Sequence, residues 1–219
     1  MALEVYWGSG SPFAWRVLLT LEVKRIPYNS KLLEFSKGQH KAPEYLKLNP
    51  RGRVPTIKDG DFILYESLAI MTYLDRKYPE VPIFGGTPEE AGLIWRRVSE
   101  SESYLRDAIT QVVQPLFFGK ASEKAPEIAA GAETVHHELA GLDATVAKSP
   151  WLGGASVSAA DIALFPFVQL LLRGASKDAA KPLNLGFLPL SQRYPHFAEW
   201  VKRVESLPGY ERTYPPHWK

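Results

Sequence analysis

The spacing of apolar and polar residues divides the chain into two differently organised parts. In the first part, short apolar runs typical of strands alternate with segments whose apolar residues recur every three or four positions, as in helices. Asp59-Gly60 indicates a hairpin within residues 53–66. The remaining pattern predicts strands over 3–8 and 28–35, helices over 12–24 and 66–79, and a short irregular helix over 36–50. This order is typical of a small α/β sheet layered with helices.

From residue 80 onward the pattern becomes helical throughout. Thr87-Pro88-Glu89-Glu90 matches a capping box with proline at the first helical position, and Ser158-Ala159-Ala160-Asp161 is its acidic version. Helices are predicted from residue 88 to 114, ending before Pro115, then over about 124–148, from 159 onward and over about 192–206. We therefore expect an α/β domain over residues 1–80, a linker over 81–87 and an all-helical domain over 88–219.

Bulk composition excludes several classes of function. The formal net charge is +2, from 26 basic and 24 acidic residues, and without a Lys/Arg cluster this argues against nucleic-acid binding. No apolar run approaches the ~20 residues that span a bilayer. The start MALEVYW lacks the features of a signal peptide, so we expect a cytoplasmic protein.

The chain contains no cysteine, which bears directly on its chemistry. Disulfides, thiolate metal sites and cysteine nucleophiles are excluded, so any sulfur chemistry must use sulfur from a ligand. His136 and His137 are neighbours on a predicted helix and point to different sides, which argues against a metal pair. We expect no metal cofactor.

A serine-rich turn joins the first predicted strand to the first predicted helix. In the stretch GSGSPFAWRV, Ser11 suits the helix N-cap and Pro12 the first helical position. The same hydroxyl can instead stand at the mouth of a site, where it and the free N–H groups of the helix would favour a thiolate over a thiol. The stretch alone does not decide between these two interpretations.

Three further stretches carry groups that suit a small peptide ligand. Val54 before Pro55 can offer its N–H and C=O to an extended peptide at a strand start. Glu66-Ser67 opens a predicted helix whose N-terminus attracts a carboxylate, while the Glu66 side chain can accept from an amine. His40-Lys41 can meet a second carboxylate. The alternatives are an ordinary strand start, plain helix capping and a solvated surface.

Together these stretches fit a ligand with two carboxylates, one amine and one thiol, and glutathione is such a ligand. The chain also resembles the cytosolic glutathione transferases over nearly its whole length. The block KGQHKAPEYLKLNPRGRVPTIKDGDFILYESLAIMTYLDRKYP is similar to the theta, phi and zeta classes, and SPFAWRV to the serine motifs of the tau and zeta classes. SVSAADIALFP is similar to the N-capping box of the family's helical domain.

The resemblance implies a thioredoxin-like N-terminal domain, an all-α C-terminal domain, a homodimer, and glutathione as co-substrate. Ser11 would hydrogen-bond the glutathione sulfur. The glycyl carboxylate would face His40 and Lys41. The cysteinyl unit would pair with the backbone of Val54, which precedes a cis proline. Glu66 and Ser67 would hold the γ-glutamyl end. The residues so implied to bind glutathione are Phe13, His40, Lys41, Arg53, Val54, Pro55, Glu66 and Ser67.

Two other hydroxyls compete with Ser11. Ser9 lies two residues upstream, and Tyr6 lies in the first predicted strand, where the tyrosine classes keep their catalytic group. Ser9 suits a turn between glycines, and Tyr6 suits a strand aromatic. We therefore prefer Ser11, because the residues after it match the serine motif.

The family binds its second substrate, a small hydrophobic electrophile, between the domains. The residues expected to contact it are Phe13, Tyr104, Ala108, Gln111 and Val112. Phe117 and Phe118 follow nearby in the sequence. Apolar residues at helical spacing are more often core, which is the alternative for each of them. The C-terminal YPPHWK either covers the site or packs on the surface.

Three functional hypotheses follow. The first is a glutathione transferase that activates the thiol as a thiolate for attack on an electrophilic carbon or a peroxide oxygen. The second is a glutathione-dependent isomerase of the zeta kind, although Pro12-Phe13 stands where the zeta pattern has Ser-Cys. The third is a non-catalytic module that binds glutathione or a protein.

Overall fold

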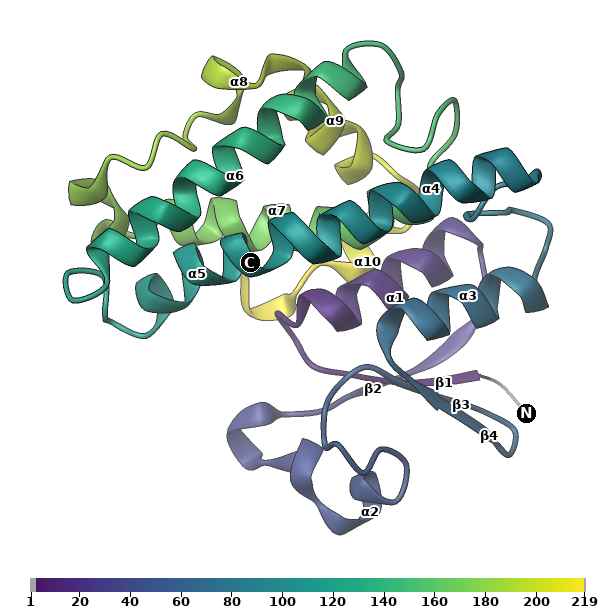
Figure 1. Ribbon diagram of the computed structural model, residues 1–219. Coiled ribbons are helices and arrows are strands. Elements are labelled where there is room, and N and C mark those ends of the chain that lie inside the picture. Colours follow the sequence, from purple (N-terminus) through teal and green to yellow (C-terminus); the bar gives the residue numbers. More distant parts are fainter. Residues whose placement is uncertain (1–2, 219) are drawn as a thin grey trace. The chain divides into compact units, whose positions relative to one another are not determined.

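The structure is a computed structural model that describes residues 3–218. The chain forms two compact units, one of Met1–Phe84 with Ser206–Lys219 and the other of Gly85–Glu205. The first unit contains the sheet and the second is helical (Figure 1). Both the α/β character of the first part and the helical character of the second agree with the sequence pattern.

The sheet of the first unit has four strands in the order β2-β1-β3-β4. β1 runs parallel to β2, whereas β3 is antiparallel to both β1 and β4. Helices α1 and α3 cover the sheet (Figure 1). The elements are β1 (Leu3–Trp7), α1 (Pro12–Val23), β2 (Tyr28–Leu32), β3 (Thr56–Asp59), β4 (Phe62–Tyr65) and α3 (Ser67–Lys77). This is the expected thioredoxin-like arrangement, and Gly60, with φ 63°, makes the predicted hairpin turn.

Alternation along β1 determines which face of the sheet is buried. Leu3, Val5 and Trp7 are buried, and Val5 stands opposite Ile57 of β3 in the register. Ile70 and Leu74, one turn apart on α3, pack against the same cluster. The apolar periodicities of strand and helix therefore meet in one core.

The stretch between β2 and β3 is irregular, as predicted. It contains the 3₁₀ turns η1 (Phe35–Lys37) and η2 (Gln39–Lys41) and the short helix α2 (Pro43–Leu46). β2 ends at Leu32, three residues before its predicted end. The Leu33 N–H still bonds to the Trp7 carbonyl at 2.7 Å, and the chain then turns into η1.

The second unit is built of helices, including a π-helical turn, η3 (Ser101–Leu105), that the sequence did not indicate. The Thr87–Glu90 capping box is present at the start of α4 as predicted. The other elements of this unit are α4 (Pro88–Glu100), α5 (Arg106–Phe117), α6 (Ala125–Val146), α7 (Ala159–Ala175), η4 (Asp178–Leu183), α8 (Leu190–Arg193) and α9 (Pro195–Glu205). None of the helices within residues 3–218 is both long and apolar enough to cross a membrane.

The structure corrects the helix prediction at Pro115 and over residues 192–206. Pro115 does not end the helix, which continues to Phe117; the Phe118 N–H bonds to the Gln114 carbonyl, and the Lys120 N–H closes the helix end on the Pro115 carbonyl. The single helix expected over 192–206 is two helices, and Pro195 occupies the first position of the second one.

The division of the chain differs from the expected one at two places. Ile83 and Phe84, assigned to the linker, are buried in the first unit, where the Asp75 carboxylate accepts the Ile83 N–H at 2.8 Å and the Lys24 ammonium at 2.9 Å. Residues 206–218 also belong to the first unit, and they include α10 (Tyr210–Thr213) and η5 (Pro216–Trp218). The Trp15 indole N–H donates to Thr213 Oγ1 at 2.8 Å and helps hold them there.

The buried Asp161 carboxylate organises the second unit. It is fully buried and accepts hydrogen bonds from the Leu152 N–H, the Trp200 indole, and both the N–H and the hydroxyl of Ser158, at 2.8–2.9 Å. These bonds join the start of α7 to the loop before it and to α9. Removal of the carboxylate would leave several buried donors without an acceptor.

We therefore predict that Asp161→Ala lowers the free energy of unfolding of this unit by about 3 kcal/mol, from the lost cap and the unsatisfied Trp200 donor. Urea denaturation of the full chain would measure this. Asp178→Ala removes a carboxylate that is 93% exposed and is the matched control, for which the midpoint should not move. Equal midpoints for the two variants would contradict the role assigned to Asp161.

Candidate functional site

The loop between β1 and α1 holds Ser11 at a helix N-terminus. Ser11 is the N-cap of α1, and its Oγ accepts the Ala14 N–H at 3.3 Å. The Ser11 N–H donates back to the Gly8 carbonyl at 3.1 Å, and Gly10, with φ 80°, makes the turn between them. The half-buried hydroxyl thus accepts one hydrogen bond, and its own hydrogen has no acceptor among the described residues.

An aromatic ring connects this loop to the segment that carries His40. The Phe35 ring lies on the backbone of Gly8, where any Cβ would come within 2.1 Å of it. The same ring meets the His40 imidazole edge to face, with centroids 5.0 Å apart. His40 Nδ1 is buried and has no hydrogen-bond partner among residues 3–218. The ring of His40 is therefore held by packing, beside the loop that carries Ser11.

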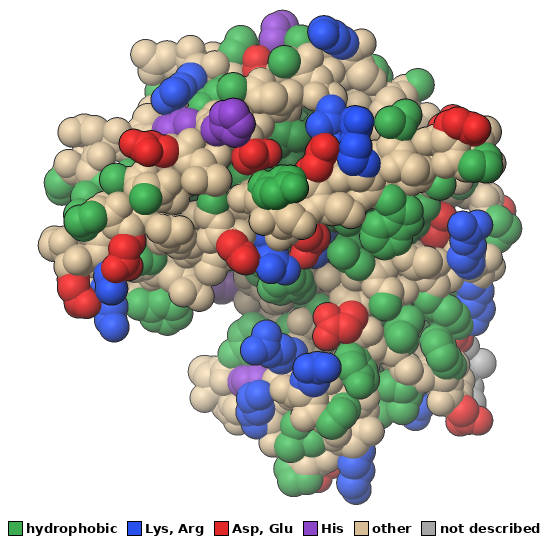
Figure 2. Space-filling view, in the orientation of Figure 1, with side chains coloured by type: hydrophobic (Ala, Val, Ile, Leu, Met, Phe, Trp, Pro, Cys, Tyr) green, Lys and Arg blue, Asp and Glu red, His purple; other side chains and the backbone are tan. Residues whose placement is uncertain are grey.

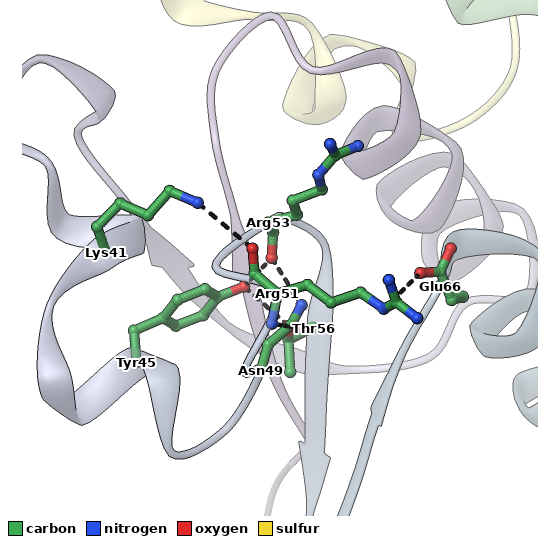
Figure 3. Close-up of polar contacts among 7 residues, drawn as sticks. All are labelled: Lys41, Tyr45, Asn49, Arg51, Arg53, Thr56 and Glu66. Carbon is green, nitrogen blue, oxygen red and sulfur yellow. Dashed lines mark hydrogen bonds and ion pairs between the residues drawn. The ribbon is translucent and has the colours of Figure 1, made fainter.

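Lys41 lies against the turn that precedes β3. Gly52 has φ 57°, and a Cβ there would lie 2.8 Å from Lys41 Nζ and 2.9 Å from the His40 carbonyl. Lys41 Nζ donates to the carbonyl of Arg51 at 3.3 Å. This bond ties η2 to the turn 49–52, as Figure 3 shows.

Buried polar side chains hold the backbone just before Val54. The hydroxyl of Tyr45 and the amide of Asn49 both donate to the Arg53 carbonyl, the latter at 2.8 Å, and Thr56 Oγ1 joins them (Figure 3). Burial raises the pKa of the Tyr45 hydroxyl, so this group stays protonated and able to donate. The Val54–Pro55 peptide bond is cis, as the resemblance implied.

Glu66 and Ser67 mark the start of α3. Glu66 has φ 73°, unusual for a residue other than glycine, and its carboxylate is exposed 3.9 Å from the Arg51 guanidinium (Figure 3). Ser67 is buried, and its Oγ lies 3.5 Å from Nη1 of Arg16. The N–H groups at a helix start are of the kind that can bind an anion.

Positive side chains gather around these elements. Figure 2 shows Lys and Arg side chains around a histidine on the visible face of the first unit. The exposed basic residues between η1 and β3 are Lys37, Lys41, Lys47, Arg51 and Arg53. Such a surface suits a ligand with carboxylates.

The two competing hydroxyls already have partners. The Tyr6 hydroxyl donates to Glu4 Oε2 at 2.8 Å, and burial, together with this acceptor, raises its pKa to about 12. Ser9 Oγ lies 2.6 Å from Nδ1 of His217. Ser11 is the hydroxyl that stands at the N-terminus of α1.

The residues predicted to contact the second substrate are divided between the two units. Phe13 is exposed in the first unit beside Ser11. In the second unit Tyr104 is exposed, whereas Ala108 and Val112 are buried where α5 packs against Gly131 of α6. The Gln111 side chain donates to the Glu127 carbonyl at 2.7 Å. Ala108 and Val112 thus contribute to the helical core, and the acceptor site remains a prediction.

Sequence reasoning missed the residues that support the loop before β3. Tyr45, Asn49 and Thr56 are buried polar residues, and Arg51 reaches Glu66 from the other side of the loop. Asn49 in the turn sequence NPRG was the available signal, because Asx side chains commonly bond to the backbone two residues on, as Asn49 does to the Arg51 N–H at 3.1 Å.

Comparison with known proteins gives matches in both parts of the chain. Family models described as the N-terminal and C-terminal domains of glutathione S-transferase match residues 10–77 and 125–203. The chain is 34% identical to glutathione S-transferase F10 of Arabidopsis thaliana over 90% of both chains. It is 29% identical to glutathione S-transferase A of Pleuronectes platessa, over 99% of this chain and 92% of that one.

A solved structure is similar along the entire chain. The crystal structure of a glutathione S-transferase from the Antarctic clam Laternula elliptica matches with a TM-score of 0.86 and 33% identity, covering 100% of this chain and 94% of that one. Sequence models, relatives and fold therefore agree over both units. The chain belongs to the glutathione S-transferase family.

Proposed function

We propose that this transferase binds glutathione along one face of its first unit and activates the thiol through Ser11. The observation that carries the proposal is the network around the turn 49–56, which links Lys41 to Glu66 through Arg51 and fixes the backbone of Val54 between them. Groups that suit a carboxylate, an extended peptide and an amino-acid terminus thus belong to one continuous set of contacts.

Each part of glutathione would meet a group of matching chemistry. His40 and Lys41 would bind the glycyl carboxylate, with Arg53 assisting. The cysteinyl unit would exchange backbone hydrogen bonds with Val54, as an added strand does. At the γ-glutamyl end, the carboxylate would accept from the N–H groups at Ser67, and Glu66 would accept from the ammonium.

The chemistry would depend on lowering the pKa of the glutathione thiol. A free thiol has a pKa near 8.5, so it is only a few per cent thiolate at neutral pH. A decrease of about two units would make most of it nucleophilic and corresponds to roughly 2.7 kcal/mol. Ser11 would supply this by donating its hydroxyl hydrogen to the sulfur, and the proton would leave to solvent. The thiolate would then form a bond to an electrophilic carbon as the leaving group departs.

The second substrate would be a small apolar electrophile. Phe13 supports this because its apolar ring is exposed and stands two residues after Ser11 in the chain. Tyr104 and Gln111 of the second unit are the further residues proposed to contact it. A homodimer and a cytoplasmic location also stay predictions.

The glutathione-binding role predicts the effect of changes at the start of α3. Calorimetric titration of the wild type should give a dissociation constant between micromolar and millimolar. The double variant Glu66→Ala/Ser67→Ala should weaken binding about ten- to a hundredfold, because it removes charge-assisted hydrogen bonds. Glu44→Ala, an exposed carboxylate on α2, is the matched control and should bind as the wild type does. If the wild type does not bind glutathione, the proposal is contradicted.

The thiol-activating role predicts a loss of turnover without a loss of binding. Ser11→Ala should raise the pKa of the bound thiol toward 8.5 and lower kcat/KM about a hundredfold below pH 7, while glutathione affinity changes little. The pH dependence of kcat/KM with a chlorinated aromatic acceptor measures both the pKa of the bound thiol and the loss in kcat/KM.

Two further variants separate the hydroxyl from the helix cap. Ser11→Asp keeps an acceptor for the Ala14 N–H but has no hydroxyl to donate, so it should fold and remain inactive. Ser11→Thr keeps both functions and should retain most of the activity. An active Ser11→Asp variant would show that only the cap matters.

A further inference from the structure

The C-terminal strap, residues 209–218, is fastened along α1 (Figure 1). The buried Trp15 ring contacts the rings of Tyr210, Tyr214 and Trp218, with centroids 5.5–6.2 Å apart, and its indole donates to Thr213. The guanidinium of Arg212 pairs with the buried carboxylate of Glu22. The strap therefore follows α1 toward its N-terminal end with aromatic, polar and ionic contacts.

The end of the strap lies on the loop that carries Ser11. His217 Nδ1 is 2.6 Å from Ser9 Oγ. A Cβ on Gly10 would come within 2.7 Å of His217 Cε1 and 3.3 Å of the Trp218 indole nitrogen. The imidazole is thus in direct contact with the residue immediately before Ser11.

The partners of His217 determine which of its nitrogens carries the hydrogen. The Trp218 indole N–H, which can only donate, donates to His217 Nε2 at 3.0 Å. Nε2 therefore accepts, and in the neutral ring the hydrogen is on Nδ1, from where it is donated to Ser9 Oγ. The Ser9 oxygen thus accepts a hydrogen bond from His217 Nδ1, and the hydrogen of the Ser9 hydroxyl points away from that nitrogen.

The loop is consequently held from two sides. The Phe35 ring lies on Gly8, and His217 lies on Ser9 and Gly10, while Ser11 is bonded back to Gly8. Both contacts come from segments remote in sequence. A small displacement of this loop would move the Ser11 hydroxyl relative to a bound sulfur, and hydrogen bonds weaken steeply with distance and angle.

We propose that His217 is a positioning residue for thiol activation, which it supports by holding Ser9 and the loop that presents Ser11. This inference rests on the proposed function of Ser11 and extends it to the C-terminal end of the chain. His217 itself would touch neither glutathione nor the electrophile. Its contribution would be the orientation of a hydroxyl donor, which affects turnover and the thiol pKa more than binding.

The test compares His217→Ala, Ser9→Ala and the double variant with the wild type. Each single variant should lower kcat/KM about three- to tenfold, the size of one neutral hydrogen bond, and should raise the pKa of bound glutathione, read from the ultraviolet absorbance of the thiolate. The glutathione dissociation constant should stay within about twofold. The double variant should be no worse than either single one, because both remove the same contact.

Three controls make the result specific. His217→Asn retains an N–H donor near the position of Nδ1 and should restore most of the activity. Trp218→Phe keeps a ring against Trp15 but loses the N–H donor that fixes the His217 tautomer. It should therefore lower kcat/KM and raise the thiol pKa in the same direction as His217→Ala, by a smaller amount. His137→Ala removes an exposed histidine of the second unit and should change nothing.

The possible failures are distinguishable. If the wild type neither binds glutathione nor forms the bound thiolate, the proposed function fails, and this inference falls with it. If the wild type is active and His217→Ala matches it in kcat and thiol pKa, only the inference is overturned. Additive losses in the double variant, or no rescue by His217→Asn, would also contradict the Ser9–His217 contact as the cause.

Discussion

The carbonyl oxygen of Arg53 is the point on which the candidate site depends. Two buried donors, the Tyr45 hydroxyl and the Asn49 amide, converge on it from the loop and helix before β3. A carbonyl with both lone pairs engaged leaves the following residue little freedom. The backbone of Val54 is therefore held in place by groups that are not among those proposed to touch glutathione. Loss of either donor would release the turn that contains Arg51 and accepts the hydrogen bond of Lys41.

Local patterns accounted for most of the secondary structure. The alternation in β1, the Asp59-Gly60 turn and the Thr87 capping box each depend on residues within a few positions of one another, so the sequence alone indicated them. The helix end predicted before Pro115 was wrong, because tertiary contacts decide whether a helix continues past a proline. Leu116, buried just after Pro115, helps keep that turn helical.

The candidate site was only partly predictable for the same reason. Serine before proline at a helix start and Glu-Ser at another are local motifs, and they were recognised. Tyr45, by contrast, acts through a carbonyl eight positions away, and Phe35 acts by lying on Gly8. No periodicity encodes these contacts. The assignment of residues 206–219 to the first unit was missed because short helices and rings carry no sign of where they pack.

The strap has a consequence for how the protein is made. The first unit is built from two segments of the sequence, and the whole second unit, Gly85–Glu205, is synthesised between them. At about 5–20 residues per second, that interval lasts on the order of ten seconds. During this time the sheet and α1 have left the ribosome, but Trp15 still lacks the rings that cover it. The nascent first unit thus exposes an aromatic surface until Tyr210, Tyr214 and Trp218 have been synthesised, and the loop with Ser11 acquires its contact with His217 only after the whole second unit.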